Sequence, residues 1–319
     1  MVSHKELHSI MFLLMLIFFI VGASNAVSAC TIFTVSNENK VLFGNNEDWS
    51  NPNTYLWFEF QEEGKFGGVY LGFDDFFPQG GMNEKGLCFD ANALPKMTLN
   101  NHPELLSPKE WIVKHIMDMG NNISDVIRVA QEFTWGNSMA YQVHFADANG
   151  DALVISPGTD GELNFTRKRP EDKYLVSTNF NVGYPPNGWT PCWRYQVATE
   201  MLNNLDHEND LTVEAVRDIL NATHQEGTYA TRYSNVFDLK NTDIYIYQNH
   251  NFSDIVKLNL GEELAKGEER YIPISDLFSQ MNTTDTQAEK TQEAPILILL
   301  SSLIILFIIR RMKFSSNGN

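Results

Sequence analysis

The sequence predicts an α+β fold, with antiparallel sheets and helices packed outside them. Short segments of strand character recur along the chain, and four longer segments carry apolar residues at helical spacing. Groups of strands alternate with helix pairs, and neither a repeat nor an internal linker interrupts residues 30–280. We therefore expect one domain over that part of the 319-residue chain rather than two smaller ones.

The predicted strands begin with a hairpin. Residues 31–35 and 40–43 alternate in strand fashion around a turn at 36–39, and a second hairpin joins 141–146 to 152–155 through an Asp-Ala-Asn-Gly turn. Further strands are expected at 69–73, 87–91, 174–177, 235–239, 244–247 and 255–260.

Four helices are predicted between these strands. Residues 107–110 form a capping box with proline at the first helical position, which indicates a helix that ends at Gly120. A second helix is expected to begin at Ser124. Apolar residues at helical spacing predict two more helices, around 193–201 and 213–220.

The first 29 residues are typical of a secretory signal peptide. An apolar run at 10–21 follows a short polar segment, and small residues lead to Ala29, after which cleavage is expected. Cleavage there makes Cys30 the first residue of the exported protein. An uncleaved membrane anchor is the alternative, although the run is short for a membrane span.

The other end of the chain predicts a membrane anchor. Residues 294–309 carry no charge and are followed by a basic cluster in the tail at 310–319, which places that tail in the cytoplasm. Residues 281–293 are polar and are interpreted as a stalk. We therefore expect an exported protein on the cell membrane, with residues 30–280 on the extracytoplasmic side. A processed C-terminal sorting signal is the alternative.

The charge of the chain excludes nucleic acid as a partner. The net charge is −17, and residues 30–290 keep 19 of the 23 basic side chains and 38 of the 40 acidic ones, a net of −19. Such a surface offers no positive patch to neutralise phosphates. The histidines show no metal-binding spacing, so neither a metal nor another cofactor is predicted.

The three cysteines are an odd number for an oxidising compartment. They are Cys30, Cys88 and Cys192. Either Cys88 and Cys192 form a disulfide and Cys30 stays free, or none of them pairs. The sequence leaves both alternatives open.

A free N-terminal cysteine joins a nucleophile to its own base. The α-amine has a pKa of about 7.7 to 8 and the thiol one of about 8.5, so a neutral amine takes the thiol proton and the thiolate attacks an acyl carbon. If the first turn centres near Asn37, Cys30 lies opposite Asn45 or Asn46. Asp48 is then within reach of the amine and suited to hold it.

Six segments match, in order, segments of one enzyme family. They are Cys-Thr-Ile-Phe at 30–33, Gly-Asn-Asn-Glu-Asp at 44–48, Gly-Met-Asn-Glu-Lys-Gly-Leu at 81–87, and residues 143–154, 176–179 and 189–195. In these segments the chain resembles the choloylglycine hydrolase and penicillin V acylase family of N-terminal-nucleophile hydrolases. The resemblance extends over residues 30–247, and its most specific element is the string at 81–87.

The resemblance implies a four-layer αββα fold and hydrolysis of a linear amide bond in a small N-acyl substrate. By motif, Cys30 is the nucleophile, its amine is the base, and Asp48 orients that amine. Asn92 and Asn179 match the positions that stabilise the oxyanion. Arg194 matches an active-site arginine near the nucleophile, where a cation favours the thiolate.

At two positions the match to the family is ambiguous or incomplete. Ala93 competes with Asn92 for its position, and we choose Asn92 because only its side chain can donate a hydrogen bond to an oxyanion. The family usually has arginine where this chain has Asn45. Either Arg194 supplies the positive charge that stabilises the thiolate, or the contacts to the substrate differ from those in the family. This weakens the prediction that bile salts in particular are the substrate. Aromatic residues between Trp49 and Phe77 either line an acyl pocket or pack in the core.

Two other functions remain open at this level. Val-Ser-Ala-Cys at 27–30 also fits a bacterial lipobox, in which Cys30 is lipidated and the protein is a surface binding module without catalysis. An acyltransferase on the same fold passes the acyl group to an amine instead of water. The sequence leaves the oligomeric state, including a homo-oligomer, undecided.

Overall fold

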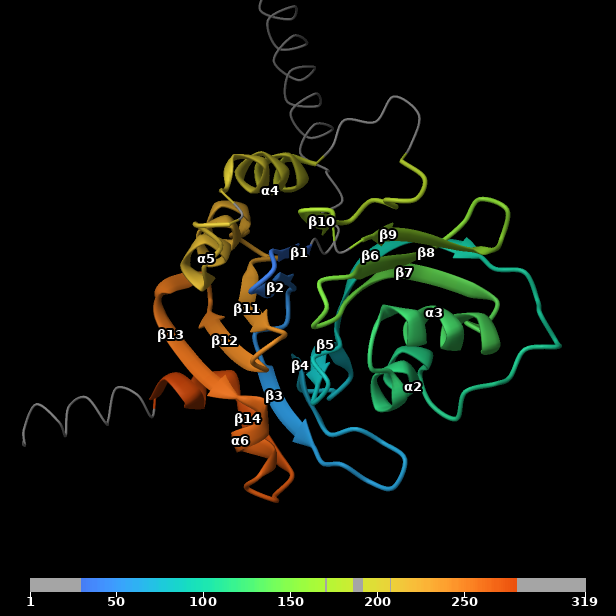
Figure 1. Ribbon diagram of the computed structural model, residues 1–319, viewed down its shortest axis with the longest axis horizontal. Coiled ribbons are helices and arrows are strands. Elements are labelled where there is room, and N and C mark those ends of the chain that lie inside the picture. Colours follow the sequence, from blue (N-terminus) through green and yellow to red (C-terminus); the bar gives the residue numbers. More distant parts are fainter. Residues whose placement is uncertain (1–29, 170, 186–191, 207, 280–319) are drawn as a thin grey trace, which may run out of the picture.

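The computed structural model describes residues 30–169, 171–185, 192–206 and 208–279 (Figure 1). The predicted signal peptide, the whole of the predicted stalk, anchor and cytoplasmic tail at 281–319, and the segment 186–191 lie outside these residues. Within the described residues, no helix is long and apolar enough to cross a membrane.

The described strands form two antiparallel sheets. In spatial order, the six-stranded sheet contains β10 (Tyr174–Ser177), β1 (Thr31–Ser36), β2 (Val41–Asp48), β11 (Thr231–Asp238), β12 (Asp243–Gln248) and β13 (Asn251–Asn259). The eight-stranded sheet contains β14 (Arg270–Pro273), β3 (Thr54–Glu59), β4 (Gly68–Phe73), β5 (Pro78–Asn83), β6 (Cys88–Thr98), β7 (Ser138–Ala146), β8 (Ala152–Pro157) and β9 (Leu163–Lys168).

The helices cover the outer faces of the two sheets. α4 (Trp193–Asn204) and α5 (Val213–Thr223) pack on the six-stranded sheet, and α2 (Ile112–Met119) and α3 (Ile123–Glu132) pack on the eight-stranded one (Figure 1). The short α6 (Leu260–Leu264) follows β13. One apolar cluster fills the space between the sheets, and one lies beneath each helix pair. The molecule is therefore built in four layers, α-β-β-α, as the resemblance implies.

Strands β3, β5, β9 and β14 were not predicted from the sequence. β5 contains two adjacent glycines, which weaken a strand pattern. At Gly81, a Cβ would lie 2.6 Å from the carbonyl oxygen of Val69 on the neighbouring β4. Close packing of β4 and β5 therefore requires glycine, and the glycines are the reason that the sequence pattern did not predict β5.

The turn of the first hairpin lies later in the chain than predicted. The side chain of Asn37 accepts hydrogen bonds from the backbone N–H groups of Asn39 (2.9 Å) and Lys40 (2.7 Å). Ser36 pairs with Val41, so the turn centres between residues 38 and 39 rather than near Asn37. Asn37 thus opens the turn as an Asx residue, and the pairing of β1 with β2 shifts accordingly.

Helix α2 does not begin at the predicted capping box. It starts at Ile112, and residues 107–110 lie outside it, although it ends before Gly120 as expected. The preceding Leu106 forms a bridge to Phe133, and its N–H donates to the carbonyl oxygen of Glu132. This pairing holds the chain extended immediately before the capping box, and α2 starts only at Ile112.

The other helices start close to their predicted positions. α3 is capped by Asn122 instead of beginning at Ser124, because the Asn122 side chain accepts from the backbone N–H of Asp125 at 3.1 Å. α4 begins at Trp193 and α5 at Val213, where the apolar spacing predicts them.

The string at 81–87 forms the turn between β5 and β6, and Asn83 organises it. Its carboxamide makes four hydrogen bonds: Oδ1 accepts from the N–H groups of Lys85 (3.0 Å) and Leu87 (3.1 Å), and Nδ2 donates to the carbonyl oxygens of Met117 (2.8 Å) and Gly120 (2.9 Å). Gly86 adopts the left-handed conformation that closes the turn (φ +74°). The motif therefore ties the end of α2 to the start of β6.

We expect Asn83→Ala to lower the free energy of unfolding by about 2 to 4 kcal/mol, because the substitution leaves several buried backbone groups without partners. Urea denaturation measures the change. Asn39→Ala, at an exposed turn position, is the matched control and is expected to stay within about 0.5 kcal/mol of the parent. Equal unfolding of both variants would contradict this structural role.

Candidate active site

Cys30 precedes β1 and is only 3% exposed. Because Thr31 pairs with Asn46, Cys30 lies beside Glu47 on β2. The predicted register, with Cys30 opposite Asn45 or Asn46, is wrong because the hairpin turn lies later in the chain. The thiol donates to Oε1 of Glu47 at an Sγ to oxygen distance of 3.6 Å.

Asp48 ends β2 and is fully buried next to Cys30. Its carboxylate accepts from Oγ1 of Thr231 (2.5 Å) and Nε2 of Gln225 (2.8 Å). Its backbone N–H bonds to the sulfur of Cys30 and opposes the rise that burial causes in the thiol pKa. Burial raises the pKa of Asp48 to about 7, against the lowering effects of the Thr231 hydrogen bond and the positive charge of Arg194.

Asn92 reaches the nucleophile from the facing sheet. It is buried on β6, and its Nδ2 donates to the backbone carbonyl oxygen of Cys30 at 3.3 Å. Its Oδ1 accepts from Nε2 of Gln142 on β7 at 3.4 Å. A side-chain amide therefore lies directly against the Cys30 backbone, at the position chosen over Ala93.

Asn179 and Arg194 join the same network. Nδ2 of Asn179 donates to the carbonyl oxygen of Ala93 (3.1 Å), and Oδ1 of Asn179 accepts from a terminal nitrogen of Arg194 (3.2 Å). The Nε of Arg194 donates to Oγ1 of Thr31 at 3.1 Å, and the arginine is 5% exposed. The structure thus brings all five predicted site residues around the start of β1.

Three further buried groups near Cys30 escaped the sequence reading: Glu47, Asp90 and Tyr233. Burial raises the pKa of Glu47 to about 8, and the charge of Asp48 adds to this rise. Burial and the charge of Glu47 also raise the pKa of Asp90 well above its usual range. A Cβ at Gly80 would lie 2.2 Å from Oδ2 of Asp90, so that glycine leaves room for the carboxyl group.

The sequence held a signal for two of these residues. Residues two apart on a strand share a face, so Asp90 lies on the face of β6 that carries Asn92. Glu47 belongs to the segment 44–48, and the correct hairpin register brings it beside Cys30. Tyr233 lies on β11 opposite Glu47, and no local motif marks it.

The buried acids make stability depend on pH. In the folded chain Glu47 and Asp48 keep their protons up to about pH 8 and pH 7, whereas in the unfolded chain they lose them near their ordinary values. The contribution of these two groups to stability is therefore complete below about pH 4 and is lost as the pH rises toward 8, by at most about 1.4 kcal/mol per pH unit for each group. Urea denaturation at several pH values measures this slope. Glu47→Gln is expected to reduce it, and an unchanged slope would contradict the assignment.

The cysteines are all free in the structure. Of the two alternatives left open by the sequence, the structure has the one without a disulfide. Cys88 is buried on β6, and the Sγ of Cys192 lies 3.0 Å from Oγ1 of Thr178, the residue before Asn179.

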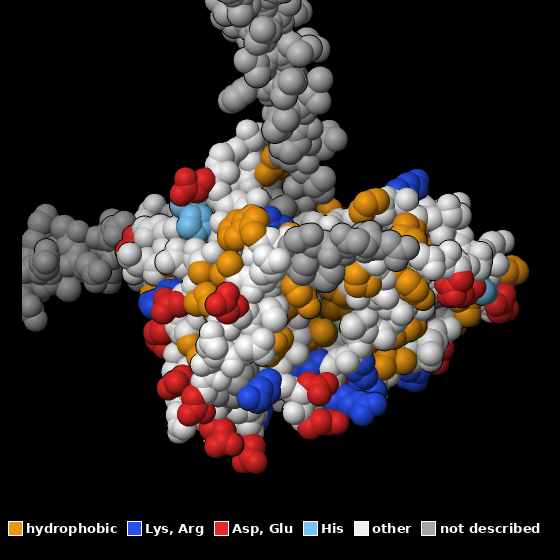
Figure 2. Space-filling view, turned by 90° about the horizontal axis from the view of Figure 1, so that it is seen from above, with side chains coloured by type: hydrophobic (Ala, Val, Ile, Leu, Met, Phe, Trp, Pro, Cys, Tyr) orange, Lys and Arg blue, Asp and Glu red, His pale blue; other side chains and the backbone are white. Residues whose placement is uncertain are grey.

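The aromatic residues between Trp49 and Phe77 divide between the core and the surface. Trp57 and Phe58 are buried, whereas Trp49, Phe76 and Phe77 are among the exposed large side chains. Trp49 contacts Phe73, whose ring contacts Tyr233 beside Glu47. Seen from the side of α4, hydrophobic side chains gather near the middle of the face, and most charged ones lie toward its rim (Figure 2).

His144 has a structural role. It is buried and hydrogen-bonded to Thr34 and Ser177, each at 3.0 Å, and burial lowers its pKa to about 3, so it is neutral. Among the described residues, no group of three or more His, Cys, Asp or Glu side chains is arranged to hold a metal ion.

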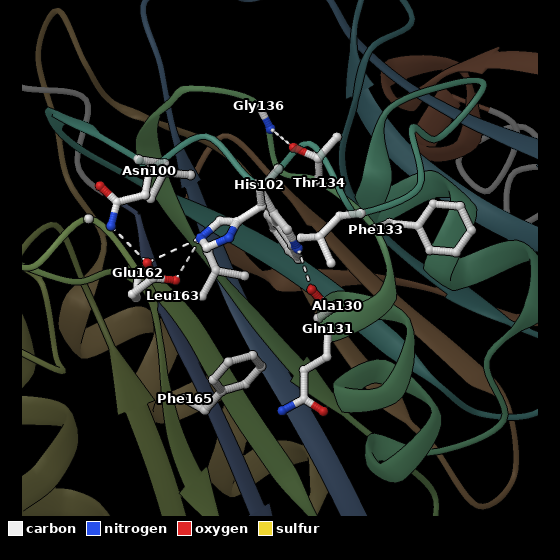
Figure 3. A pocket seen from close by; sticks show the side chains of 14 residues that line it. Asn100, His102, Ala130, Gln131, Phe133, Thr134, Gly136, Glu162, Leu163 and Phe165 are labelled. Carbon is white, nitrogen blue, oxygen red and sulfur yellow. Dashed lines mark hydrogen bonds and ion pairs between the residues drawn. The ribbon is translucent and has the colours of Figure 1, made fainter.

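A cavity of about 300 Å³ lies away from Cys30, where the end of α3 meets β9 and the loop after β6 (Figure 3). Trp135, Leu163 and Phe165 contribute to its apolar wall, and His102 and Glu162 join across its polar side at 3.0 Å. None of its lining residues belongs to the Cys30 network.

No known family profile matches the chain, and no curated protein sequence matches it. Solved structures do. Penicillin V acylase from Agrobacterium tumefaciens has a TM-score of 0.58 at 16% identity, covering 76% of this chain and 91% of that one. Two variants of conjugated bile acid hydrolase from Clostridium perfringens have TM-scores of 0.57 and 0.56 at 15% and 14% identity, covering 76% of this chain and 97% and 96% of theirs.

The chain has the fold of these enzymes. The similarity confirms the fold that the sequence motifs imply. At this level of identity it concerns the fold alone.

Proposed function

We propose that residues 30–280 form a cysteine-dependent amidase that hydrolyses a linear N-acyl amide through a thioester. One observation carries the proposal. The thiol of Cys30 contacts Glu47 and the backbone of Asp48, while the Asn92 amide lies against the Cys30 backbone from the facing sheet. A nucleophile, polar groups to activate it and a side-chain amide donor thus meet at one buried point.

The chemistry divides between these groups. Cys30 attacks the amide carbon, and Asn92 and Asn179 donate hydrogen bonds to the oxyanion that develops. The α-amine of Cys30, held by Asp48, protonates the leaving nitrogen, and water then hydrolyses the thioester. Arg194 lies next to both Asn179 and Thr31, so it fixes the Asn179 amide and adds positive charge near the site.

The proposal assigns the chain to the choloylglycine hydrolase and penicillin V acylase type. Support comes from the motifs at 30–33, 44–48 and 81–87 together with the fold shared with a penicillin V acylase and a conjugated bile acid hydrolase. The exposed Trp49 and its contact Phe73 favour substrates with an apolar acyl group. Export through residues 1–29 and anchoring through residues 294–309 complete the proposal.

Burial of the sulfur argues against the lipoprotein alternative. A lipidated Cys30 would carry its diacylglycerol group on a sulfur that contacts Glu47, in a residue that is 3% exposed. Cys30 also enters β1 directly, without the flexible polar spacer that follows most lipidated cysteines.

The test compares a protein that begins at Cys30 with one that keeps Ala29 and so has no free Cys30 amine. Both are incubated with N-acyl amino acids, penicillin V, conjugated bile salts and acyl-homoserine lactones, and the released amines are measured. We expect the first protein alone to release amine from at least one substrate. Equal release by both, or none by either, would overturn the proposal. Added free amines that become acylated would instead identify an acyltransferase.

A further inference from the structure

The sulfur of Cys30 has a carboxyl group as its closest polar side-chain contact on β2. Its thiol donates to Oε1 of Glu47 at 3.6 Å, and both residues are 3% exposed. A buried carboxylate in contact with a thiol is a proton acceptor placed on the reacting atom. The amine of Cys30 is therefore not the sole candidate for the base.

We propose that Glu47 takes the thiol proton of Cys30, and that the α-amine of Cys30 acts instead on the leaving nitrogen and on water. The inference rests on the proposed amidase function and assigns the proton transfers within that same site.

Glu47 keeps a high proton affinity because of what surrounds it. The titratable groups that face it are Cys30 before β1, Asp48 on β2, Asp90 on β6 and Tyr233 on β11. None of these four is a cation. Burial and the Asp48 charge therefore raise the pKa of Glu47 to about 8, which makes it a much stronger proton acceptor than an ordinary carboxylate. Burial also raises the pKa of the Cys30 thiol well above its usual range, so the two groups shift in the same direction.

Asn45 explains why no cation is paired with Glu47. It lies two residues before Glu47, on the same face of β2, at the position where the resembling family usually carries arginine. A guanidinium there would pair with Glu47 and lower its pKa. Asparagine brings no positive charge, and its side-chain hydrogen bond lowers the pKa of Glu47 by less than burial and the charge of Asp48 raise it. The Oε2 atom of Glu47 has no hydrogen-bond partner among the described residues.

The proton transfers balance over one cycle. As the sulfur to carbon bond forms, the thiol proton moves to the Glu47 carboxylate, and the protonated amine gives its proton to the leaving nitrogen as the C–N bond breaks. Water then attacks the thioester and gives a proton to the neutral amine. As the C–S bond breaks, Glu47 returns its proton to sulfur. The net reaction is amide plus water to acid plus amine.

Alkylation of Cys30 by iodoacetamide tests the first transfer without any substrate. The rate is followed by peptide mass spectrometry in chains that begin at Cys30 and in chains that keep Ala29, with Cys192 in each digest as internal reference. At about pH 8.5 we expect Glu47→Gln to slow Cys30 alkylation at least about tenfold in both chains. Glu47→Asp is expected to recover part of the rate, and Glu63→Gln, an exposed matched control, to change nothing.

An equal or faster rate in Glu47→Gln would overturn the inference, since Glu47 would then only oppose the thiolate. If only the retention of Ala29 slows the alkylation of Cys30, the inference would also be overturned, and the amine would be the group that takes the thiol proton. Urea denaturation shows whether Glu47→Gln is folded. If it is not, the alkylation rate of Glu47→Asp is measured between about pH 6 and 10 instead. A pH dependence of that rate equal to the parent's would overturn the inference.

The same set of variants separates this inference from the function it rests on. If alkylation depends on Glu47 but no substrate of the panel releases amine, the proton transfer is supported and the proposed amidase function is overturned. If amine is released but alkylation does not depend on Glu47, the proposed amidase function is supported and the proton transfer to Glu47 is overturned.

Discussion

Cys30→Ala is expected to lower amide hydrolysis by at least about 10⁴-fold, to the level of the uncatalysed reaction in the assay. The variant removes the only atom that forms the thioester, whereas the remaining amide donors cannot form a covalent intermediate. The measurement is release of amine from the best substrate of the panel, at equal concentrations of folded protein.

Cys192→Ser is the matched control for this variant. Cys192 is also a free cysteine, and its sulfur contacts Thr178 instead of Glu47. We expect Cys192→Ser to keep most of the activity. If Cys192→Ser loses activity and Cys30→Ala keeps it, the nucleophile would be Cys192 and not Cys30.

Asn92→Ala is expected to lower kcat by about 10² to 10³-fold with little change in KM, because an oxyanion donor acts mainly in the transition state. Asn92 donates to the Cys30 carbonyl from the facing sheet, so its amide is next to the reacting carbon in the proposed mechanism.

Steady-state kinetics of Asn92→Ala beside Asn100→Ala checks this effect. Asn100 lines the separate cavity of Figure 3 and is bonded to Glu162, away from Cys30. A rise in KM with unchanged kcat in Asn92→Ala would indicate ground-state binding and remove Asn92 from the oxyanion site.

The fold class could be predicted because its periodic segments are long. The helix faces at 193–201 and 213–220 appear where α4 and α5 form, and the strands at 31–35, 174–177 and 244–247 lie within β1, β10 and β12. Strands between two buried layers are harder to predict, since they lose the alternation of polar and apolar residues. β1 is buried at every position.

Local signals failed where distant contacts decide the conformation. The capping box at 107–110 is a valid helix signal, yet pairing of Leu106 with Phe133 keeps the preceding chain extended. The residues of the site were predicted by motif, and the structure brings all five together. Glu47 was missed because Asn37 starts the hairpin turn instead of centring it, and a shift of the register changes which residue lies beside Cys30.

The central claim is that the mature N-terminus is a free, acylatable Cys30. Its most direct test is peptide mass spectrometry of the exported protein, quenched in acid during turnover of an N-acyl amide. We expect an N-terminal peptide that starts at Cys30, has an unblocked amine and carries the acyl group on sulfur as a thioester cleaved by hydroxylamine. A lipidated or blocked Cys30, an N-terminus elsewhere, or the acyl group on Cys192 would contradict the claim.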